Sequence, residues 1–231
     1  MKEKNDLKKA LFHDIKNKLL TIKFNIYLIL KKPLDEEKKE ELLNKVLLTT
    51  DQVLDIVQDI LDYEKYKSKK FKKYSTFNLI ELVDEIIDEL ELDAQRKNIK
   101  ILFVKPKEVL NIKANKEWLK KALFNILHNS IKYNKNNGRV IINFHIEKNG
   151  YILIIKDTGK GISIEEREKI FKKYYSTDQK TGTGIGLNLA KTIIENLGGT
   201  IIVKSEKERG SAFYIYLPKT PKKKFNLLFL K

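Results

Sequence analysis

The sequence predicts an α+β protein in which an N-terminal helical hairpin, forming a dimeric four-helix bundle, precedes an α/β sandwich. Up to residue 67, apolar residues recur at spacings of three and four, which is typical of helices. Beyond residue 76, amphipathic helical segments alternate with short apolar strands. Hydrophobic residues make up 42% of the 231 residues, so the chain can bury a core.

The N-terminal part is predicted to be two long helices joined by a short turn. Pro33 cannot continue the first helix, and Asp35 is the predicted N-cap of the second. Two helices alone cannot bury such wide apolar stripes, so a homodimer is expected, with packing on the chain's own C-terminal part as the alternative. The stripes comprise Phe12, Ile15, Leu19, Ile22, Ile26 and Ile29 in the first helix, and Leu43, Val46, Thr50, Val53, Val57 and Ile60, widened by Leu47, Leu54 and Leu61, in the second.

The C-terminal part is predicted to be a sheet covered on one face by helices. The expected boundaries are a hairpin at 1–67, a basic linker at 68–76, a sandwich at 77–218 and a basic, apolar tail at 219–231. The sandwich is expected to have helices at 77–98, 115–134 and 185–197, and strands at 99–103, 109–113, 140–147, 151–157, 200–205 and 211–218.

Composition argues against several kinds of site, partner and segment. The chain has no cysteine, which rules out disulfides and thiolate metal sites. Its net charge of +16 comes from lysines that are spread along the chain and mixed with glutamates, so nucleic acid is not an expected partner. The most apolar early window is interrupted by Lys23 and Asn25, which excludes a membrane span there.

An ionisable pair, His13 and Asp14, lies in the first predicted helix. His13 follows the stripe residue Phe12, so it points about 100° away from it around the helix and is expected to be exposed. Asn17 lies four residues further on, on the same face. An exposed imidazole can act as a nucleophile that a neighbouring carboxylate assists. The alternative is a solvated histidine on a polar face.

The segment NILHNSIKYN places four polar side chains on one face of a helix: Asn125, Asn129, Lys132 and Tyr133. An amide oxygen can ligate Mg²⁺, a lysine can pair with phosphate and a tyrosine can stack on a base. The alternative is an ordinary polar helix face.

Two glycine-rich segments follow. In DTGKGIS, Asp157 ends an apolar strand, and Gly159 and Gly161 allow a close approach of the backbone to a ligand. In TGTGIGLNLAK, the glycines at 182, 184 and 186 (Gly182, Gly184, Gly186) lead directly into a helix whose N–H groups can bind phosphate. The polar stretch between these segments is expected to be a mobile lid, with Phe171, Tyr174 and Tyr175 as its anchors. Each glycine segment alone is also compatible with an ordinary turn.

Taken together and in this order, these motifs resemble the sensor histidine kinases of two-component systems. The last four resemble the Bergerat-type ATP-binding fold that these kinases share with type II topoisomerases, Hsp90 and MutL. The resemblance extends from about Leu7 to Pro218. It implies a protein histidine kinase that binds ATP and Mg²⁺, phosphorylates itself on a histidine and passes the phosphoryl group to an aspartate of a response-regulator receiver domain. A phosphatase-biased core and a non-catalytic, nucleotide-gated scaffold are the alternatives.

The resemblance also implies a role for each motif residue. His13 would be the phosphoacceptor, Asp14 would assist proton transfer, and Asn17 matches a position linked to hydrolysis of the phosphorylated partner. Asn129 would bind Mg²⁺ with support from Asn125. The remaining roles are Lys132 on phosphate, Tyr133 at the adenine, Asp157 on the adenine amino group, and Gly159, Gly161, Gly182, Gly184 and Gly186 shaping the pocket and lid.

The sequence departs from the family pattern at Lys18, in the first predicted helix, and in the tail after Pro218. Lys18 stands where the family usually has proline, so a kink there should be weaker or absent. The tail after Pro218 is a candidate contact with an anionic membrane surface or a partner, and a frayed end is the alternative. A sensor subunit is another possible partner, and the expected location is cytoplasmic, peripheral to a membrane-associated system.

Overall fold

The computed structural model describes residues 2–67, 73–175 and 184–221, with side chains from Phe12 onward. The chain divides into two compact units, and we describe each by itself. The first unit comprises residues 1–68 and 174–185, and the second comprises 69–173 and 186–231. The linker residues 68–72, the central lid residues 176–183 with Gly182, and the tail from residue 222 lie outside the described residues.

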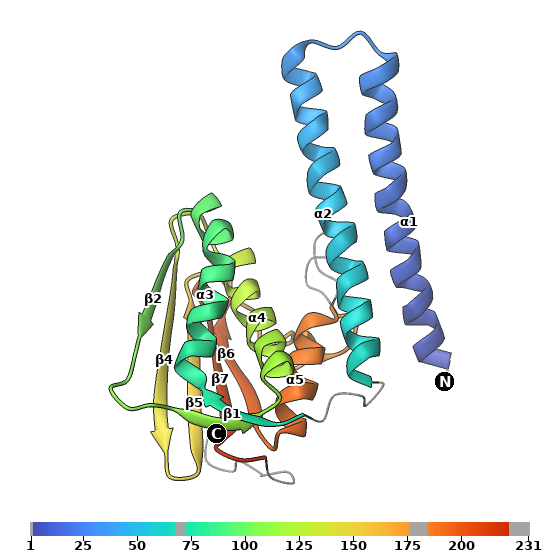
Figure 1. The fold of residues 1–231 in the computed structure, drawn as a ribbon. Coiled ribbons are helices and arrows are strands. Elements are labelled where there is room, and N and C mark those ends of the chain that lie inside the picture. The colour runs from blue at the N-terminus through green and yellow to red at the C-terminus, as the bar shows by residue number, and fades with distance from the viewer. Residues whose placement is uncertain (1, 68–72, 176–183, 222–231) are drawn as a thin grey trace. The chain divides into compact units, whose positions relative to one another are not determined.

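The first unit is built on a helical hairpin. Helices α1 (Lys2–Lys31) and α2 (Glu36–Lys67) lie side by side and run in opposite directions (Figure 1). Asp35 caps α2, because its Oδ1 accepts the backbone N–H of Lys38 at 2.7 Å, which confirms the predicted N-cap. Between the helices, Lys18 Nζ donates to Gln52 Oε1 at 2.7 Å. The two helices therefore contact each other through polar as well as apolar side chains.

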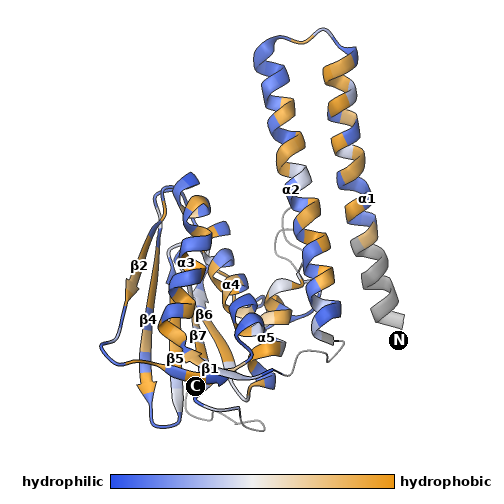
Figure 2. Ribbon diagram, in the orientation of Figure 1, coloured by the Kyte–Doolittle hydropathy of each residue, from blue (hydrophilic) through white to orange (hydrophobic). Residues whose placement is uncertain are grey.

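The predicted stripe of α1 is only partly the surface that contacts α2. Phe12 and Leu19 remain 57% and 50% exposed, whereas Asn25, which lay outside the predicted stripe, is buried. These exposed fractions agree with the expectation that two helices alone cannot bury such wide apolar stripes, although the predicted stripe did not include the buried Asn25. A single partner helix covers one face of α1 and leaves the neighbouring apolar face open. Figure 2 shows apolar residues along the coloured parts of both helices.

A small apolar cluster completes the first unit. Ile56 of α2 and Ile185 are its buried members. Half-buried side chains pack against them: Ile15, Ile60, Tyr63 and Tyr174. Residues 174–175 and 184–185, which flank the central lid residues, thus belong to the same compact unit as the hairpin.

The second unit is a mixed five-stranded sheet with three helices on one face (Figure 1). The strand order is β2-β4-β5-β7-β6, in which β2 pairs with β4 in parallel and the other neighbours are antiparallel. The strands are β2 (Lys100–Val104), β4 (Arg139–Glu147), β5 (Gly150–Asp157), β6 (Thr200–Glu206) and β7 (Gly210–Pro218), and the helices are α3 (Leu79–Arg96), α4 (Lys116–Lys132) and α5 (Gly186–Asn196), with a short 3-10 turn, η1 (Lys169–Phe171).

A separate two-stranded ribbon was only half predicted. Strand β3 (Asn111–Ala114) matches a predicted strand, but its antiparallel partner β1 (Ser75–Asn78) covers residues expected to be linker and helix. The helix α3 begins later, at Leu79, because the Asn78 side chain caps it by accepting the N–H of Ile80. The expected linker thus ends in a strand rather than in irregular chain.

The core of the second unit lies between the helices and the sheet. Its fully buried members include residues of α3, α4, α5 and the central strands, among them Leu82, Leu123, Ile142, Leu189 and Ile215. The predicted α+β class, with N-terminal helices followed by a mixed sheet, is confirmed. Within the residues that the structure describes, no helix has the length and apolar character needed to cross a membrane.

Candidate functional site

Asp157 is the central polar residue of the candidate site. It ends β5 and is 6% exposed. Its Oδ1 accepts the backbone N–H groups of Gly159 at 2.9 Å and of Ser211 at 3.1 Å. Burial raises the pKa of this carboxyl group, and the two N–H donors together with the Ser130 hydroxyl oppose that rise. Oδ2 takes part in neither backbone bond, so it is the atom that can accept a ligand amine.

The loop after Asp157 fits against the end of α4 only because it contains glycines. A Cβ on Gly159 would lie 2.5 Å from the carbonyl oxygen of Tyr133. Gly161 has φ +65°, and a Cβ there would lie 1.9 Å from the carbonyl oxygen of Glu206. The Lys160 N–H donates to Tyr133 O at 3.2 Å. The two predicted glycines therefore let the loop lie against the end of α4, at Gly159, and against the end of β6, at Gly161.

Helix α4 places the four predicted polar residues at and near its C-terminal end. Asn125 is buried, and its Nδ2 donates to Gly186 O at 3.1 Å, so it joins α4 to the start of α5. Asn129 is half-buried, and its side-chain amide makes no hydrogen bond within the described part of the chain. Lys132 and Tyr133 end the helix, both half-buried. The face is thus polar as predicted, although Asn125 is inside the fold rather than on its surface.

Positive charge accumulates at this end of α4. Lys132 Nζ lies 5.9 Å from the centre of the Tyr133 ring, and Lys160 Nζ lies 4.4 Å from it. Lys97 donates to the main-chain carbonyls of Ile131 and Lys132. Burial, followed by the neighbouring charge of Lys132, lowers the pKa of Lys97. Lys132 and Lys160 thus place two ammonium groups around one aromatic ring.

Asn134 and Thr158 were missed by the sequence reasoning, although they connect the two main motifs. The buried Asn134 amide donates to the carbonyls of Ser130 and Arg139, both at 3.1 Å. Its Oδ1 accepts the Thr158 hydroxyl at 3.1 Å. These bonds connect the end of α4 to Thr158, which lies between Asp157 and Gly159. The signal that could have found Asn134 is its place directly after Tyr133, where a helix-ending amide is common.

The structure describes two of the three predicted lid glycines, Gly184 and Gly186. Gly184 has φ +64°, its carbonyl accepts the N–H of Tyr174 at 2.8 Å, and a Cβ on it would lie 2.4 Å from the Tyr174 carbonyl carbon. Gly186 begins α5, and a Cβ there would lie 3.4 Å from the Asn125 side chain. Of the expected anchors, Phe171 is buried, and Tyr174 and Tyr175 are half-buried.

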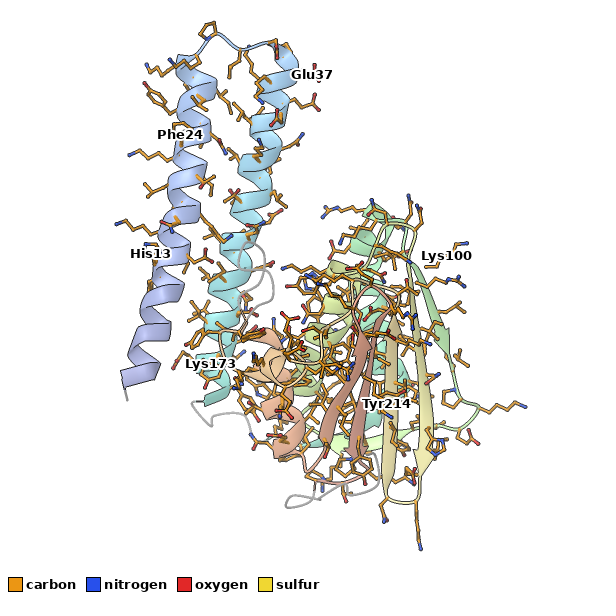
Figure 3. All side chains as sticks on the ribbon, turned by 180° about the vertical axis from the view of Figure 1, so that it is seen from behind. His13, Phe24, Glu37, Lys100, Lys173 and Tyr214 are labelled. Carbon is orange, nitrogen blue, oxygen red and sulfur yellow. The ribbon has the colours of Figure 1, made fainter. Side chains whose placement is uncertain are left out.

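His13 lies on the hairpin and is exposed, as expected. Its side chain, and that of Phe24 on the same helix, project from α1 (Figure 3). The Asn17 Nδ2 lies 3.1 Å from His13 Nδ1 and donates to it, while Asp14 is half-buried. When Nδ1 accepts this bond, Nε2 carries the ring proton. The other two histidines have different surroundings, since His128 stacks on Phe124 and His145 pairs with Glu147.

The comparison with known proteins identifies the family. Residues 114–221 match the family model described as histidine kinase-, DNA gyrase B- and HSP90-like ATPase. The sensor histidine kinase YclK of Bacillus subtilis is 30% identical over 217 residues, which cover 91% of this chain and 46% of YclK. The solved catalytic domain of the histidine kinase ThkA is 31% identical with a TM-score of 0.60, covering 66% of this chain and 99% of that domain.

The chain belongs to the sensor histidine kinases. A second ThkA structure, solved in complex with the response regulator protein TrrA, matches 95% of this histidine kinase chain with 25% identity and a TM-score of 0.78, and the match covers 63% of ThkA there. The chain spans between 10% and 59% of the length of the first curated relatives that it matches.

A magnesium ion would find few protein ligands in the described part of the chain. No group of three or more histidine and acidic side chains gathers in the described ranges, so a dedicated protein cage for the ion is not found there. The amide of Asn129, half-buried and without a side-chain partner in the same ranges, supplies one suitable oxygen. Because Mg²⁺ is usually held by one or two protein groups together with substrate phosphates, this donor set fits.

Proposed function

We propose that the chain is the core of an ATP-dependent protein histidine kinase that phosphorylates itself on His13 and transfers the phosphoryl group to an aspartate of a response regulator. The observation that carries the proposal is that one chain has both parts of such a reaction. An exposed imidazole, fixed by Asn17, lies on the helical hairpin, and the family's ATPase domain follows it. The proposed division is 1–67 for the hairpin, 68–76 for the linker, 77–218 for the ATP-binding domain and 219–231 for the tail.

In the ATP-binding domain, each predicted residue has a chemical task. Asp157 Oδ2 accepts a hydrogen from the adenine amino group, and the Tyr133 ring packs on the base. Lys132 and the backbone N–H groups that follow Gly184 and Gly186 neutralise phosphate charge. Asn129 would hold Mg²⁺ with Asn125 behind it, and the ion, when bound, neutralises charge on the phosphate oxygens.

At the hairpin, the proposed reaction forms a nitrogen–phosphorus bond. A ring nitrogen of His13 attacks the γ-phosphorus, the bond to the bridging oxygen breaks, and ADP leaves. The attacking nitrogen must be the one that carries no proton, and as the new bond forms the proton on the other ring nitrogen passes to Asp14 or to water. The Asn17 amide, which lies 3.1 Å from Nδ1, holds the ring during this step. Asn17 thus has two proposed tasks, fixing the ring in this step and serving the hydrolysis of the phosphorylated partner.

Two partners belong to the proposal. A second copy of the chain would cover the apolar face of the hairpin, where Phe12, Leu19, Phe24 and Leu54 are each at least 50% exposed. A response-regulator receiver domain would accept the phosphoryl group. The support for the second partner is the ThkA structure, which was solved with the response regulator TrrA.

The deciding experiment is incubation of the full chain with γ-labelled ATP and Mg²⁺. We expect acid-labile, base-stable label on the native chain and none on His13→Gln. The exposed His145 offers a matched control, because His145→Gln should be labelled like the native chain. Label that survives His13→Gln would contradict the assigned site. Nucleotide binding without any label, together with loss of phosphate from a phosphorylated receiver domain, would instead support the phosphatase-biased core.

A further inference from the structure

Within the DTGKGIS segment, the Lys160 side chain contacts the aromatic ring of Tyr133 at the end of α4. Its Nζ lies 4.4 Å from the centre of the Tyr133 ring, nearer than the 5.9 Å of Lys132 Nζ. A cation within about 6 Å of a ring centre is attracted by the negative face of the ring. Lys160 lies between Gly159 and Gly161 in the sequence, and none of the roles expected from the motifs falls on it.

The backbone of Lys160 is fixed on both sides. Its N–H donates to Tyr133 O at 3.2 Å, and its carbonyl accepts the N–H of Glu208 at 2.7 Å. Gly159 keeps the loop this close to Tyr133, because any side chain there would meet the Tyr133 carbonyl. The lysine side chain therefore extends from a fixed point directly beside the ring that it contacts.

The ammonium group has no competing carboxylate. Lys160 is exposed and forms no ion pair among residues 12–67, 73–175 and 184–221. Its charge is therefore directed at the Tyr133 ring rather than at a neighbouring acid. By contrast, other lysines of the chain, such as Lys105, are bound to a carboxylate at 2.8 Å.

We propose that Lys160 is a positioning residue of the nucleotide site, which holds the Tyr133 ring in the orientation that packs on the adenine. This inference rests on the proposed function, since it assumes that Tyr133 contacts the base. A ring held in place before the ligand arrives loses less conformational freedom on binding, so affinity rises. Because Lys160 acts through the ring, its effect should be the same for adenosine, ADP and ATP.

The test measures binding of these three ligands to the full chain, by competition against a fluorescent ATP analogue. Lys160→Met should weaken all three by about two- to fivefold, the range expected for an exposed cation–π contact. Lys160→Arg should restore the native affinity, because guanidinium also stacks on aromatic rings. Lys107→Met, at an exposed lysine in the loop after β2, is the matched control and should change nothing.

A double-mutant cycle with Tyr133→Leu distinguishes positioning from direct contact. In the Tyr133→Leu background, Lys160→Met should have no further effect. Loss of ATP and ADP affinity with unchanged adenosine affinity would overturn the proposal, because it would show direct contact with phosphate. An undiminished effect in the Tyr133→Leu background would also overturn it. The cycle uses binding alone, so missing label on His13 would refute the kinase reaction without altering this result.

Discussion

In the proposed function, Asp157 has two requirements that conflict in most side chains, since it would have to be buried to contact the base and charged to accept the adenine amine strongly. Burial raises its pKa, so the native state holds the proton more tightly than the unfolded chain does. The stability that follows from this is fully present below the unfolded pKa of about 3.9 and is lost as the pH rises through the raised native pKa. At pH 7 the ionised group therefore costs folding free energy.

Asp157→Asn should separate these two requirements. The amide oxygen can still accept the N–H groups of Gly159 and Ser211, which both bind Oδ1, while an NH₂ group replaces Oδ2. We expect about 10- to 100-fold weaker ATP binding, since a hydrogen bond to a charged group is lost. The melting temperature of the variant, minus that of the native chain, should be larger at pH 7 than at pH 4. Asp51→Asn, at an exposed site on α2, should do neither, and an equal loss of stability at both pH values would contradict this account.

Asn134 illustrates a contact that sequence reasoning cannot find, namely the bond that it makes to Thr158 across the site. Its neighbours Asn129, Lys132 and Tyr133 stand at helical spacings, so a pattern predicts them, whereas Asn134 lies past the last turn and bonds to Thr158 across the site. Such a partnership depends on how strand β5 returns to α4, which no local spacing encodes.

Asn134→Ala should lower the free energy of unfolding by about 1–3 kcal/mol, because the carbonyls of Ser130 and Arg139 and the Thr158 hydroxyl lose a buried partner. Chemical denaturation would measure this change. Asn44→Ala, at an exposed position of α2, provides the matched control and should stay within about 0.5 kcal/mol of the native chain. A similar stability for the two variants would mean that the network is not important for the fold.

At the scale of elements, the two glycine-rich segments tolerate an added side chain to different degrees. Gly161→Ala would force a side chain into φ +65° and to within 1.9 Å of the Glu206 carbonyl oxygen, so it should destabilise the chain by about 2 kcal/mol or more. Gly186→Ala meets only an ordinary contact of 3.4 Å with Asn125, so the fold should tolerate it. Thermal unfolding of the two variants would check the order, and equal melting temperatures would contradict it.

The elements themselves were largely predictable, and the reason differs from one to another. The helices α3, α4 and α5 were predicted from apolar periodicity, and the strands β4 and β5 from their short apolar segments, because these signals are local. The ribbon β1–β3 was missed as a pair, since its partners lie far apart in sequence and β1 has four residues. The order of the sheet, with β7 between β5 and β6, likewise depends on contacts that no short window contains.

At the scale of the whole molecule, the open apolar face of the hairpin predicts that the chain works as a dimer. Leu47→Glu combined with Leu54→Glu, at positions 63% and 61% exposed, should shift the chain to monomers in analytical ultracentrifugation. Buried charges in a helix bundle without partners are strongly unfavourable. Asp55→Lys, about a quarter-turn away on the exposed polar side of α2, should leave the dimer intact. A native chain that sediments as a monomer would refute the prediction.

Helix α1 continues from Lys2 to Lys31 without interruption, with Lys18, bonded to Gln52, where the family pattern has proline. Sharp bends in helices arise at proline and a few other defects, so α1 has no joint at the turn that follows His13. Its stiffness determines which mechanical inputs can reach the imidazole. A displacement of α1 along its axis, or a rotation about that axis, would be transmitted to His13 because the helix is continuous. A bending motion would not be localised near His13, because the helix has no kink there.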